Sequence, residues 1–292
     1  MNKKPNHLYY RLICLFAVLF SHAGFASESG YTVTRQVQYG FTLKNTANRL
    51  LKGAEFRTYA PVKETATQRC EQITASHPYD LVEDNFGNQI LCFKVDDLPP
   101  YAVKIITIRA TLRLAETPNP TKVPDLKAFL KPERYIESDD SELLRLAKDL
   151  KRSLPVETAK SIFTWVADNV TYSGYMSDDR GALYAFKNRR GDCTESMYLF
   201  TALCRANEIP ARGIGGYICS ENSTLRSNAY HNWAEFYDDG AWKIADPQKK
   251  SFMEKPSRYI AMRIIGTPAG NQIGEFHRFR FSGEGLDVRM ND

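Results

Sequence analysis

Hydrophobic residues alternate with polar residues through much of the first third of the chain. The alternation has a period of two at 31–43, 91–95 and 106–114, and Arg35 is the one break in the first of these stretches. A period of two places every second side chain on the same face of a β-strand, so one face is buried and the other is wet. We therefore expect residues 31–114 to form an antiparallel β-sandwich.

The pattern changes in the second half of the chain to helical spacing followed by short strands. Apolar residues at intervals of three and four predict amphipathic helices at 141–151 and after Pro155. Residues 194–207 are apolar on nearly every side, as expected of a helix buried in a core. Further patterns predict strands at 211–219, 231–237 and 241–246 and a closing hairpin at 274–290. The second half is therefore expected to be an α+β region.

Other segments mark the organisation of the chain. Residues 1–26 combine three basic residues with an apolar run at 12–20 and small residues at Gly24 and Ala26. This pattern is typical of a cleaved secretory signal peptide and is too short for a membrane span. Four prolines within 117–137 indicate an extended linker. We predict a signal peptide at 1–26, a β-sandwich domain at 27–116, a linker at 117–137 and a second domain at 138–292. The mature protein is expected to be periplasmic or secreted, without a membrane span.

The formal net charge of +5 comes largely from the expected signal peptide. That segment holds three of the 39 basic residues and no acidic residue, which leaves 36 basic against 34 acidic residues. A nearly neutral mature chain gives no argument for binding nucleic acid or a membrane surface. The cysteines lack zinc-type spacing, and residues 84–88 lack the alternating ligands and closing glutamate of a calcium loop. We predict no metal and no cofactor.

A cysteine, a histidine and an aspartate stand in distinctive settings in the second half. Cys193 is expected at the N-terminus of the buried helix, where unpaired N–H groups and the positive end of the helix dipole favour a thiolate. The same N–H groups can stabilise an oxyanion. His231 begins one predicted strand and Asp246 ends the next. A thiol nucleophile needs a base, and the base needs an orienting group, so the three residues are candidate catalytic residues.

The spacing of the two strands leaves the geometry of His231 and Asp246 open. A four-residue loop at 237–240 would place them directly opposite each other, with Cβ atoms about 4.5–5.5 Å apart. A loop one residue shorter would make the pair diagonal. Taken singly, each candidate also fits a plainer role: a disulfide cysteine, a packed histidine, or the start of an Asp-Pro turn. Their combination in this order favours shared chemistry.

With their neighbours, these residues resemble the transglutaminase-like superfamily of thiol enzymes. The matching segments are Gly-Asp-Cys at 191–193, Ile-Pro-Ala-Arg at 209–212 with Gly-Tyr at 216–217, His-x-Trp-x-Glu at 231–235, and Trp-x-x-x-Asp-Pro at 242–247. The resemblance covers roughly residues 141–252. It implies a papain-like core with Cys193 as nucleophile, His231 as general base and Asp246 as the orienting residue. More loosely, the first region resembles immunoglobulin-like domains that precede some bacterial transglutaminase-like domains.

The resemblance implies that Cys193 attacks an amide or peptide carbonyl through an acyl-enzyme, as in a cysteine peptidase or amidase. A cross-linking protein-glutamine acyltransferase is the first alternative. Animal transglutaminases place a tryptophan upstream of the cysteine to stabilise the oxyanion, whereas residues 182–190 contain none. A non-catalytic binding module that kept the fold is a second alternative.

Two aromatic residues are candidates for substrate binding. Tyr172 would lie at the rim of the cleft, although an ordinary loop aromatic fits the same pattern, and Trp233 lies two residues after His231. The expected partner is a protein or peptide substrate, with cell-envelope material as one candidate.

Cleavage of the signal peptide would remove Cys14 and leave five cysteines. Because exported proteins meet an oxidising compartment, paired cysteines are expected to cross-link there. We predict a Cys70–Cys92 bridge between neighbouring segments of the sandwich and a Cys204–Cys219 bridge between the buried helix and the next strand. The second pair also fits two small buried core residues. Cys193 is the one left over and is expected to stay a free thiol.

Overall fold

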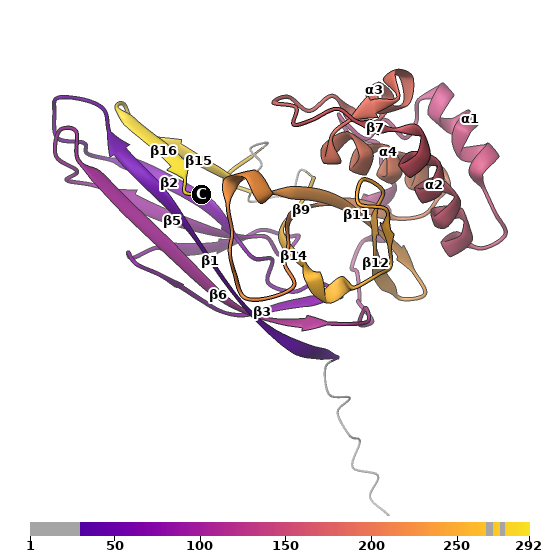
Figure 1. The fold of residues 1–292 in the computed structure, drawn as a ribbon, viewed down its shortest axis with the longest axis horizontal. Helices are drawn as coiled ribbons and strands as arrows, with labels where there is room; N and C mark the ends of the chain where they lie inside the picture. Colours follow the sequence, from indigo (N-terminus) through magenta and orange to yellow (C-terminus); the bar gives the residue numbers. More distant parts are fainter. Residues whose placement is uncertain (1–29, 267–270, 275–277) are drawn as a thin grey trace, which may run out of the picture.

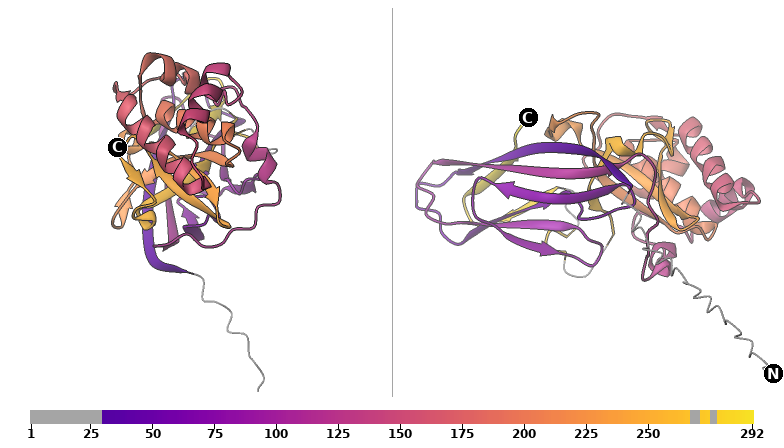
Figure 2. Two further views of the ribbon diagram at one scale, coloured as in Figure 1. Left: turned by 90° about the vertical axis from the view of Figure 1, so that its right-hand side faces the viewer. Right: turned by 90° about the horizontal axis from the view of Figure 1, so that it is seen from below.

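The computed structural model describes residues 30–266, 271–274 and 278–292. The molecule is elongated, with β-strands at one end and helices packed against a further sheet at the other (Figures 1 and 2). This arrangement confirms the predicted α+β class, with a sheet-rich N-terminal region ahead of a mixed core. The predicted signal peptide at 1–26 lies outside the described residues.

Two sheets form the first region. One has the order β10-β1-β6-β3, with β16 also paired to β1, and the other has the order β15-β2-β5-β4. Their strands are β1 (Tyr31–Asn45), β2 (Ala54–Ala60), β3 (Gln68–Ala75), β4 (Asp80–Glu83), β5 (Gln89–Val95), β6 (Val103–Ala115), β10 (Ser223–Thr224), β15 (Phe279–Ser282) and β16 (Leu286–Met290). Side chains from both sheets fill one core, and β1 alternates between buried and more exposed positions along most of its length. Even Arg35 follows this alternation, because it is buried.

A third sheet and four helices form the core at the other end. The sheet has the order β13-β12-β11-β9-β14, and the helices pack against it (Figure 1). The helices are α1 (Ser141–Leu150), α2 (Pro155–Asn169), α3 (Gly181–Asn188) and α4 (Cys193–Ala206), and the strands are β9 (Ala211–Ile218), β11 (His231–Asp238), β12 (Ala241–Asp246), β13 (Ser251–Phe252) and β14 (Tyr259–Ile264). Every residue of α4 from Thr194 to Arg205 is buried. This confirms the prediction made from the apolar residues on nearly every side of the helix.

Short elements connect these parts. The parallel pair β7 (Thr171–Tyr172) and β8 (Arg190–Gly191) precedes α4. The 3-10 helices are η1 (Leu126–Leu130), η2 (Ser227–Ala229) and η3 (Pro256–Arg258). Helix η1 lies within the predicted linker and packs Phe129 edge-on against Trp242, with ring centroids 5.1 Å apart. The segment is therefore not purely extended. The predicted domain boundaries themselves stay a prediction.

The closing hairpin predicted at 274–290 is wrong in its pairing. Strand β15 pairs with β2 in one sheet of the sandwich, and β16 pairs with β1 in the other. The turn at Gly283–Gly285 therefore links the two sheets. The two regions also share part of one apolar core, because Tyr217 on β9 and Ile260 on β14 pack in the same cluster as β1 and β6.

The two predicted disulfides are not formed, and all five cysteines in the described part of the chain are free. Cys70 lies on β3 and Cys92 on β5, which belong to different sheets. Cys204 packs in the cluster around the helices, whereas Cys219 packs in the sandwich cluster. Cys70 packs against the sandwich core, whereas Cys92 packs against the separate cluster of Tyr59 and Ile90, so neither expected pair shares one apolar cluster. Cys193 is also free in this structure, and its expected role stays a prediction.

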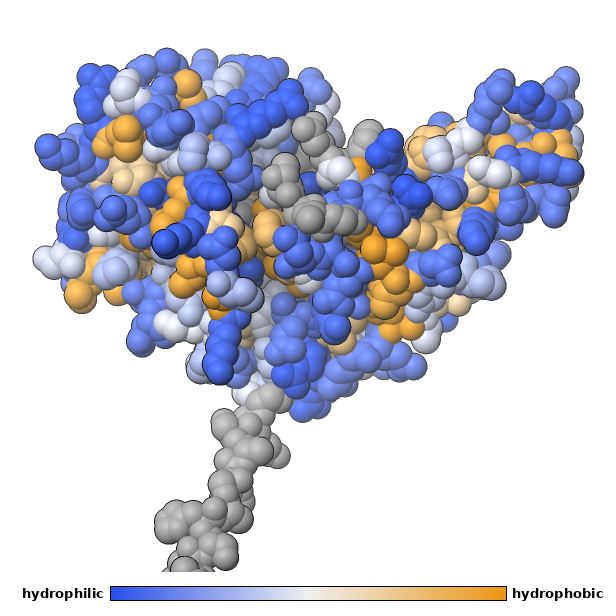
Figure 3. Space-filling view, turned by 180° about the vertical axis from the view of Figure 1, so that it is seen from behind, coloured by the Kyte–Doolittle hydropathy of each residue, from blue (hydrophilic) through white to orange (hydrophobic). Residues whose placement is uncertain are grey.

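One face of the molecule can be judged by its hydropathy. The face in Figure 3 is mainly hydrophilic, with small hydrophobic patches scattered over it. Among the described residues, no helix has the length and apolar character needed to cross a bilayer.

Candidate active site

Cys193 is the first residue of α4 and is partly buried. Asp192 precedes it as the N-cap, and its Oδ1 accepts a hydrogen bond from the Thr194 N–H at 2.7 Å. Its Oδ2 accepts another from the Met176 N–H at 3.1 Å. An aspartate is a favoured N-cap because it satisfies otherwise unpaired N–H groups. Asp192 thus starts the helix and also fixes the loop that precedes α3.

The buried side chain of Glu195 also holds the backbone around the start of α4. Its two carboxyl oxygens each accept a backbone hydrogen bond at 3.1 Å, from Asp192 and from Arg180. Burial raises the pKa of Glu195 to about 7, against the lowering effect of these hydrogen bonds. A Cβ at residue 191 would lie 2.5 Å from the Glu195 Cβ, so this position requires glycine. The Gly-Asp-Cys-x-Glu sequence therefore has a steric and a capping cause.

His231 and Asp246 come together across β11 and β12, but not in the register expected. Asp238 pairs with Ala241, so only Asp239 and Gly240 form the turn, and both have positive φ angles of 50° and 76°. Positive φ at both central positions is the type I′ geometry that Asp-Gly favours. The register then places Trp233 opposite Asp246, so the four-residue loop was wrong and His231 is diagonal to Asp246.

The diagonal pair still makes direct contact. The His231 Nε2–H donates to the Asp246 Oδ2 at 2.7 Å, and Cys193 lies near enough to the ring to raise its pKa. Asp246 is fully buried and accepts further bonds from the Tyr259 hydroxyl at 3.2 Å and the Lys249 N–H at 3.1 Å. The structure therefore brings the three candidate catalytic residues into one chain of contacts.

The environment of His231 favours its charged form. Burial lowers the pKa of the imidazole, but the hydrogen bond to Asp246 and the nearness of Asp246 and Cys193 outweigh this effect and raise the pKa to about 9. A histidine with this pKa is protonated at neutral pH. A charged imidazole beside a cysteine is the setting that activates a thiol nucleophile.

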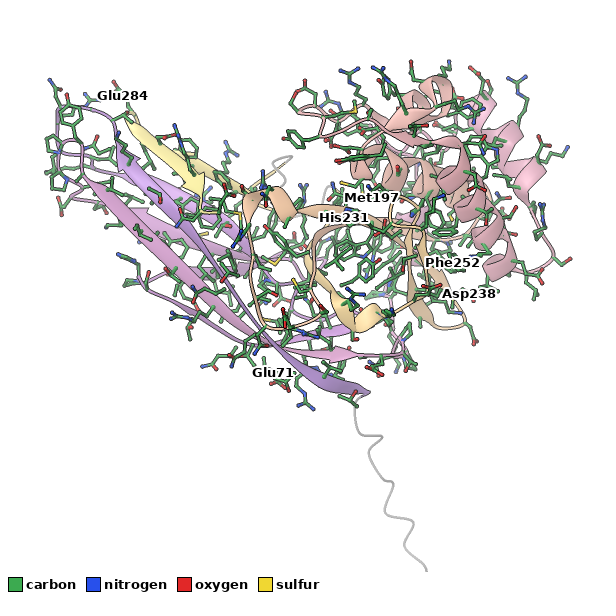
Figure 4. All side chains as sticks on the ribbon, in the orientation of Figure 1. Glu71, Met197, His231, Asp238, Phe252 and Glu284 are labelled. Carbon is green, nitrogen blue, oxygen red and sulfur yellow. The ribbon has the colours of Figure 1, made fainter. Side chains whose placement is uncertain are left out.

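A hydrogen bond joins the helix that carries Cys193 to the strand that carries His231. The Asn232 Nδ2 donates to the Thr194 Oγ1 at 2.9 Å, and both residues are buried. Asn232 directly follows His231, and Thr194 directly follows Cys193. This contact therefore helps to fix the distance between the thiol on α4 and the imidazole on β11. Helix α4 packs on β11, and Figure 4 labels Met197 of this helix and His231 of this strand.

A buried ion pair explains two further motif residues. Arg212 on β9 lies directly opposite Glu235 on β11, with 2.8 and 2.7 Å from Nε and Nη2 to the same carboxyl oxygen. The guanidinium also lies 4.1 Å above the ring centroid of Trp242. The pair sets the register of β9 against β11, so the Pro-Ala-Arg and His-x-Trp-x-Glu segments meet in space.

A cavity of about 450 Å³ opens in front of Cys193. Its walls are Tyr175, Met176, Ser177, Asp179, Asp192, Cys193, Thr194, Ser227, Asn228, Tyr230, Asn232 and Arg278. A larger and more open groove runs along α2, but none of the three candidate catalytic residues lines it. The smaller cavity is therefore the candidate substrate site.

The two predicted substrate-binding residues do not line this cavity. Trp233 is 1% exposed and packs against Tyr259 and His231. This burial corrects its expected role, because the ring supports the histidine from behind and cannot reach a substrate. Tyr172 is exposed on β7, but Tyr175 occupies the rim of the cavity. Sequence reasoning missed Tyr230, Asn232 and Arg278. The first two flank His231, which is a usable signal, whereas Arg278 lies 47 residues from His231 in the chain.

Comparison with known proteins agrees with this geometry. Residues 145–247 match the family described as the transglutaminase-like superfamily. The structure of a candidate cysteine protease from Cytophaga hutchinsonii aligns with a TM-score of 0.57 at 20% identity, covering 88% of this chain and 92% of that chain. The periplasmic domain of TgpA from Pseudomonas aeruginosa aligns with a TM-score of 0.44 at 11% identity, covering 73% and 88%.

No curated protein matched the chain. At 20% identity, the Cytophaga hutchinsonii structure supports the fold alone. The matched segment 145–247 contains Cys193, His231 and Asp246. Over residues 145–247, the chain is therefore similar to the transglutaminase-like superfamily.

Proposed function

We propose that this protein is a thiol hydrolase that cleaves amide or peptide bonds. The observation that carries the proposal is the buried contact between His231 and Asp246 at 2.7 Å, with Cys193 near enough to the same ring to raise its pKa. A nucleophile, a base and an orienting carboxylate in contact are what amide attack by a thiol requires.

The steps follow from these positions. The Cys193 thiolate attacks the carbonyl carbon, and the positive end of the α4 dipole stabilises the oxyanion. The C–N bond breaks as the His231 imidazolium gives its proton to the departing amine, which leaves a thioester on Cys193. Water then attacks the thioester while His231 takes its proton. The carboxylic acid product is released and the thiolate–imidazolium pair is restored.

Hydrolysis is preferred to protein cross-linking. In a cross-linking acyltransferase an amine replaces water in the second half of the reaction, and the tryptophan expected upstream of the cysteine is absent from 182–190. A non-catalytic module is disfavoured because burying a histidine and an aspartate together has a cost that a merely structural site need not bear. We further propose that the protein is exported after cleavage within residues 1–26.

Reaction of Cys193 with iodoacetamide tests the proposal. The wild-type thiol should react rapidly at pH 7, and His231→Ala should slow the reaction strongly because it removes the imidazolium partner. Incubation with casein-derived peptides and with peptidoglycan fragments, followed by mass spectrometry, then separates hydrolysis from transfer. The proposal fails if His231→Ala leaves the alkylation rate unchanged.

A further inference from the structure

Arg278 brings a positive charge into the candidate substrate cavity. It lines the same cavity of about 450 Å³ as Cys193, although it comes from the chain just before β15. A compact cavity of this volume is roughly 10 Å across, about the length of three extended residues. A group bound to Arg278 therefore lies within a few residues of a carbonyl at Cys193.

The guanidinium is held in place by neighbours on two elements. Its Nη1 donates to the Ser227 carbonyl oxygen at 2.7 Å, in the 3-10 helix η2 just ahead of His231. Its carbon lies 5.4 Å from the ring centroid of Tyr230, and Tyr217 lies near enough for the charge of Arg278 to act on its pKa. These contacts orient the planar group and occupy only part of its set of five N–H donors.

The neighbours of Arg278 do not neutralise it. Among the residues that the structure describes, its contacts are a carbonyl oxygen and two phenols, and no carboxylate forms an ion pair with it. The Asp292 carboxylate approaches only indirectly, through the Ser227 hydroxyl. A half-buried cation without a counter-charge favours an anionic ligand, because the ligand compensates its desolvation.

The two acidic residues of the cavity are already engaged. Both carboxyl oxygens of Asp192 accept backbone N–H groups, and Asp179 accepts the Tyr198 hydroxyl at 2.7 Å. They anchor the loop at the rim of the cavity to α4. Arg278 is therefore the group whose charge is available to a substrate.

We propose that Arg278 binds a carboxylate of the substrate, close to the scissile amide. The inference rests on the proposed function and narrows its substrate to amides that carry a nearby carboxylate. A guanidinium suits this task because its fork of N–H donors matches the two oxygens of a carboxylate. The carboxylate is either the C-terminus of a peptide or the side chain of an acidic residue.

Binding to the Cys193→Ala variant tests the subsite without turnover. The first pair of probes is acetyl-tetra-alanine with a free C-terminal carboxylate and the same peptide as its C-terminal amide. The second pair is acetyl-Ala-Glu-Ala-amide and acetyl-Ala-Gln-Ala-amide. Titration calorimetry at low salt should show about tenfold or tighter binding for the carboxylate member of one pair, as expected for a charge-assisted contact. The responding pair identifies the source of the carboxylate.

Charge variants made in the Cys193→Ala background complete the test. Arg278→Gln should abolish the preference, Arg278→Lys should keep part of it, and Arg280→Gln on β15 should keep all of it as a control for the loss of one charge. If Arg278→Gln unfolds the protein, as judged by circular dichroism, Arg278→Lys against Arg280→Gln decides the matter. Equal binding within both pairs, absence of binding, or a preference that survives Arg278→Gln would overturn the proposal. None of these outcomes depends on the reactivity of Cys193, so this test and that of the hydrolase can fail separately.

Discussion

The paired strands β1 and β6 of the sandwich differ from β9, β11 and β12 of the core in what surrounds them. Along β1, buried residues alternate with more exposed ones through most of its length. Along β9 and β11, nearly every residue is buried on both faces, and the buried set includes Arg212, His231 and Glu235. The sandwich is thus held mainly by apolar burial. The core adds buried polar contacts, and those contacts also position the candidate catalytic residues.

The largest effect is expected when one carboxyl oxygen of Asp246, a buried polar group of the core, is replaced by an amide nitrogen. Asp246→Asn should keep the fold but lower the rate of amide hydrolysis by about 10⁴, because an amide cannot hold the imidazole in the same protonation state. Steady-state hydrolysis of a peptide substrate and a melting curve measure the two effects. An unchanged rate in a folded variant would remove Asp246 from the mechanism.

One ion pair from each region allows the contributions of buried and exposed pairs to stability to be compared directly. Arg212→Met leaves Glu235 as an uncompensated buried charge and should cost about 3–5 kcal/mol of unfolding free energy. Lys63→Met breaks the exposed Lys63–Glu83 pair of the sandwich, whose length is 2.8 Å, and should leave the unfolding free energy nearly unchanged because solvent screens the pair. Urea denaturation measures both. Replacing Arg212 and Glu235 together by Met and Leu should recover much of the loss, and similar costs for the two single variants would contradict the comparison.

The pH dependence of stability follows from His231. Its pKa is raised from the ordinary 6.5 to about 9, so the folded state binds the proton more tightly than the unfolded state. The resulting stabilisation is complete below about pH 6.5 and is lost as the pH rises through about 9, with a magnitude on the order of 3 kcal/mol. Urea denaturation between pH 6 and 10 should show this decline, and Asp246→Asn should flatten it. A stability that rises over this window would refute the assignment.

The smallest expected effect concerns the bond between α4 and β11. Thr194→Val removes the hydroxyl that accepts from Asn232 and should slow alkylation of Cys193 by about tenfold, with a corresponding shift in its pH profile. Thr201→Val is the matched control, because that hydroxyl bonds only within α4, to the Met197 carbonyl at 2.8 Å. Equal effects of the two changes would reduce the Thr194 contact to a purely structural one.

The sandwich was the easier region to predict because its information is local. Each strand has one wet face, so the period-two pattern identified β1, the end of β5 and β6 without knowledge of their partners. The pairing of β15 and β16 was missed because the turn at Gly283–Gly285 fits both a hairpin and a link between two sheets. Pattern and turn residues do not record which distant strand lies alongside.

The site was predictable in its residues but not in its geometry. Cys193, His231 and Asp246 stood out through their neighbours, and α4 through its apolar surroundings. The apolar pattern does not give the register of β11 and β12, because both faces are buried and shifting the strands leaves the pattern intact. The Asp239-Gly240 dipeptide does give it, since it favours a two-residue turn, and the prediction of a four-residue loop passed over this signal. Arg278 reaches the cavity through long-range folding of the chain, for which no local signal exists.

The pairing of β1 with β16 has a consequence for the order in which the chain acquires its structure during synthesis. Phe41 pairs with Met290, almost the full length of the chain away. By contrast, His231 and Asp246 are fifteen residues apart and joined by a tight turn, so their strands can pair as soon as both have emerged. One edge of β1 must wait for residues 286–290, exposing unsatisfied N–H and C=O groups that invite association with other chains. The nascent protein is therefore most prone to association at β1, while the candidate His231–Asp246 pair can already assemble.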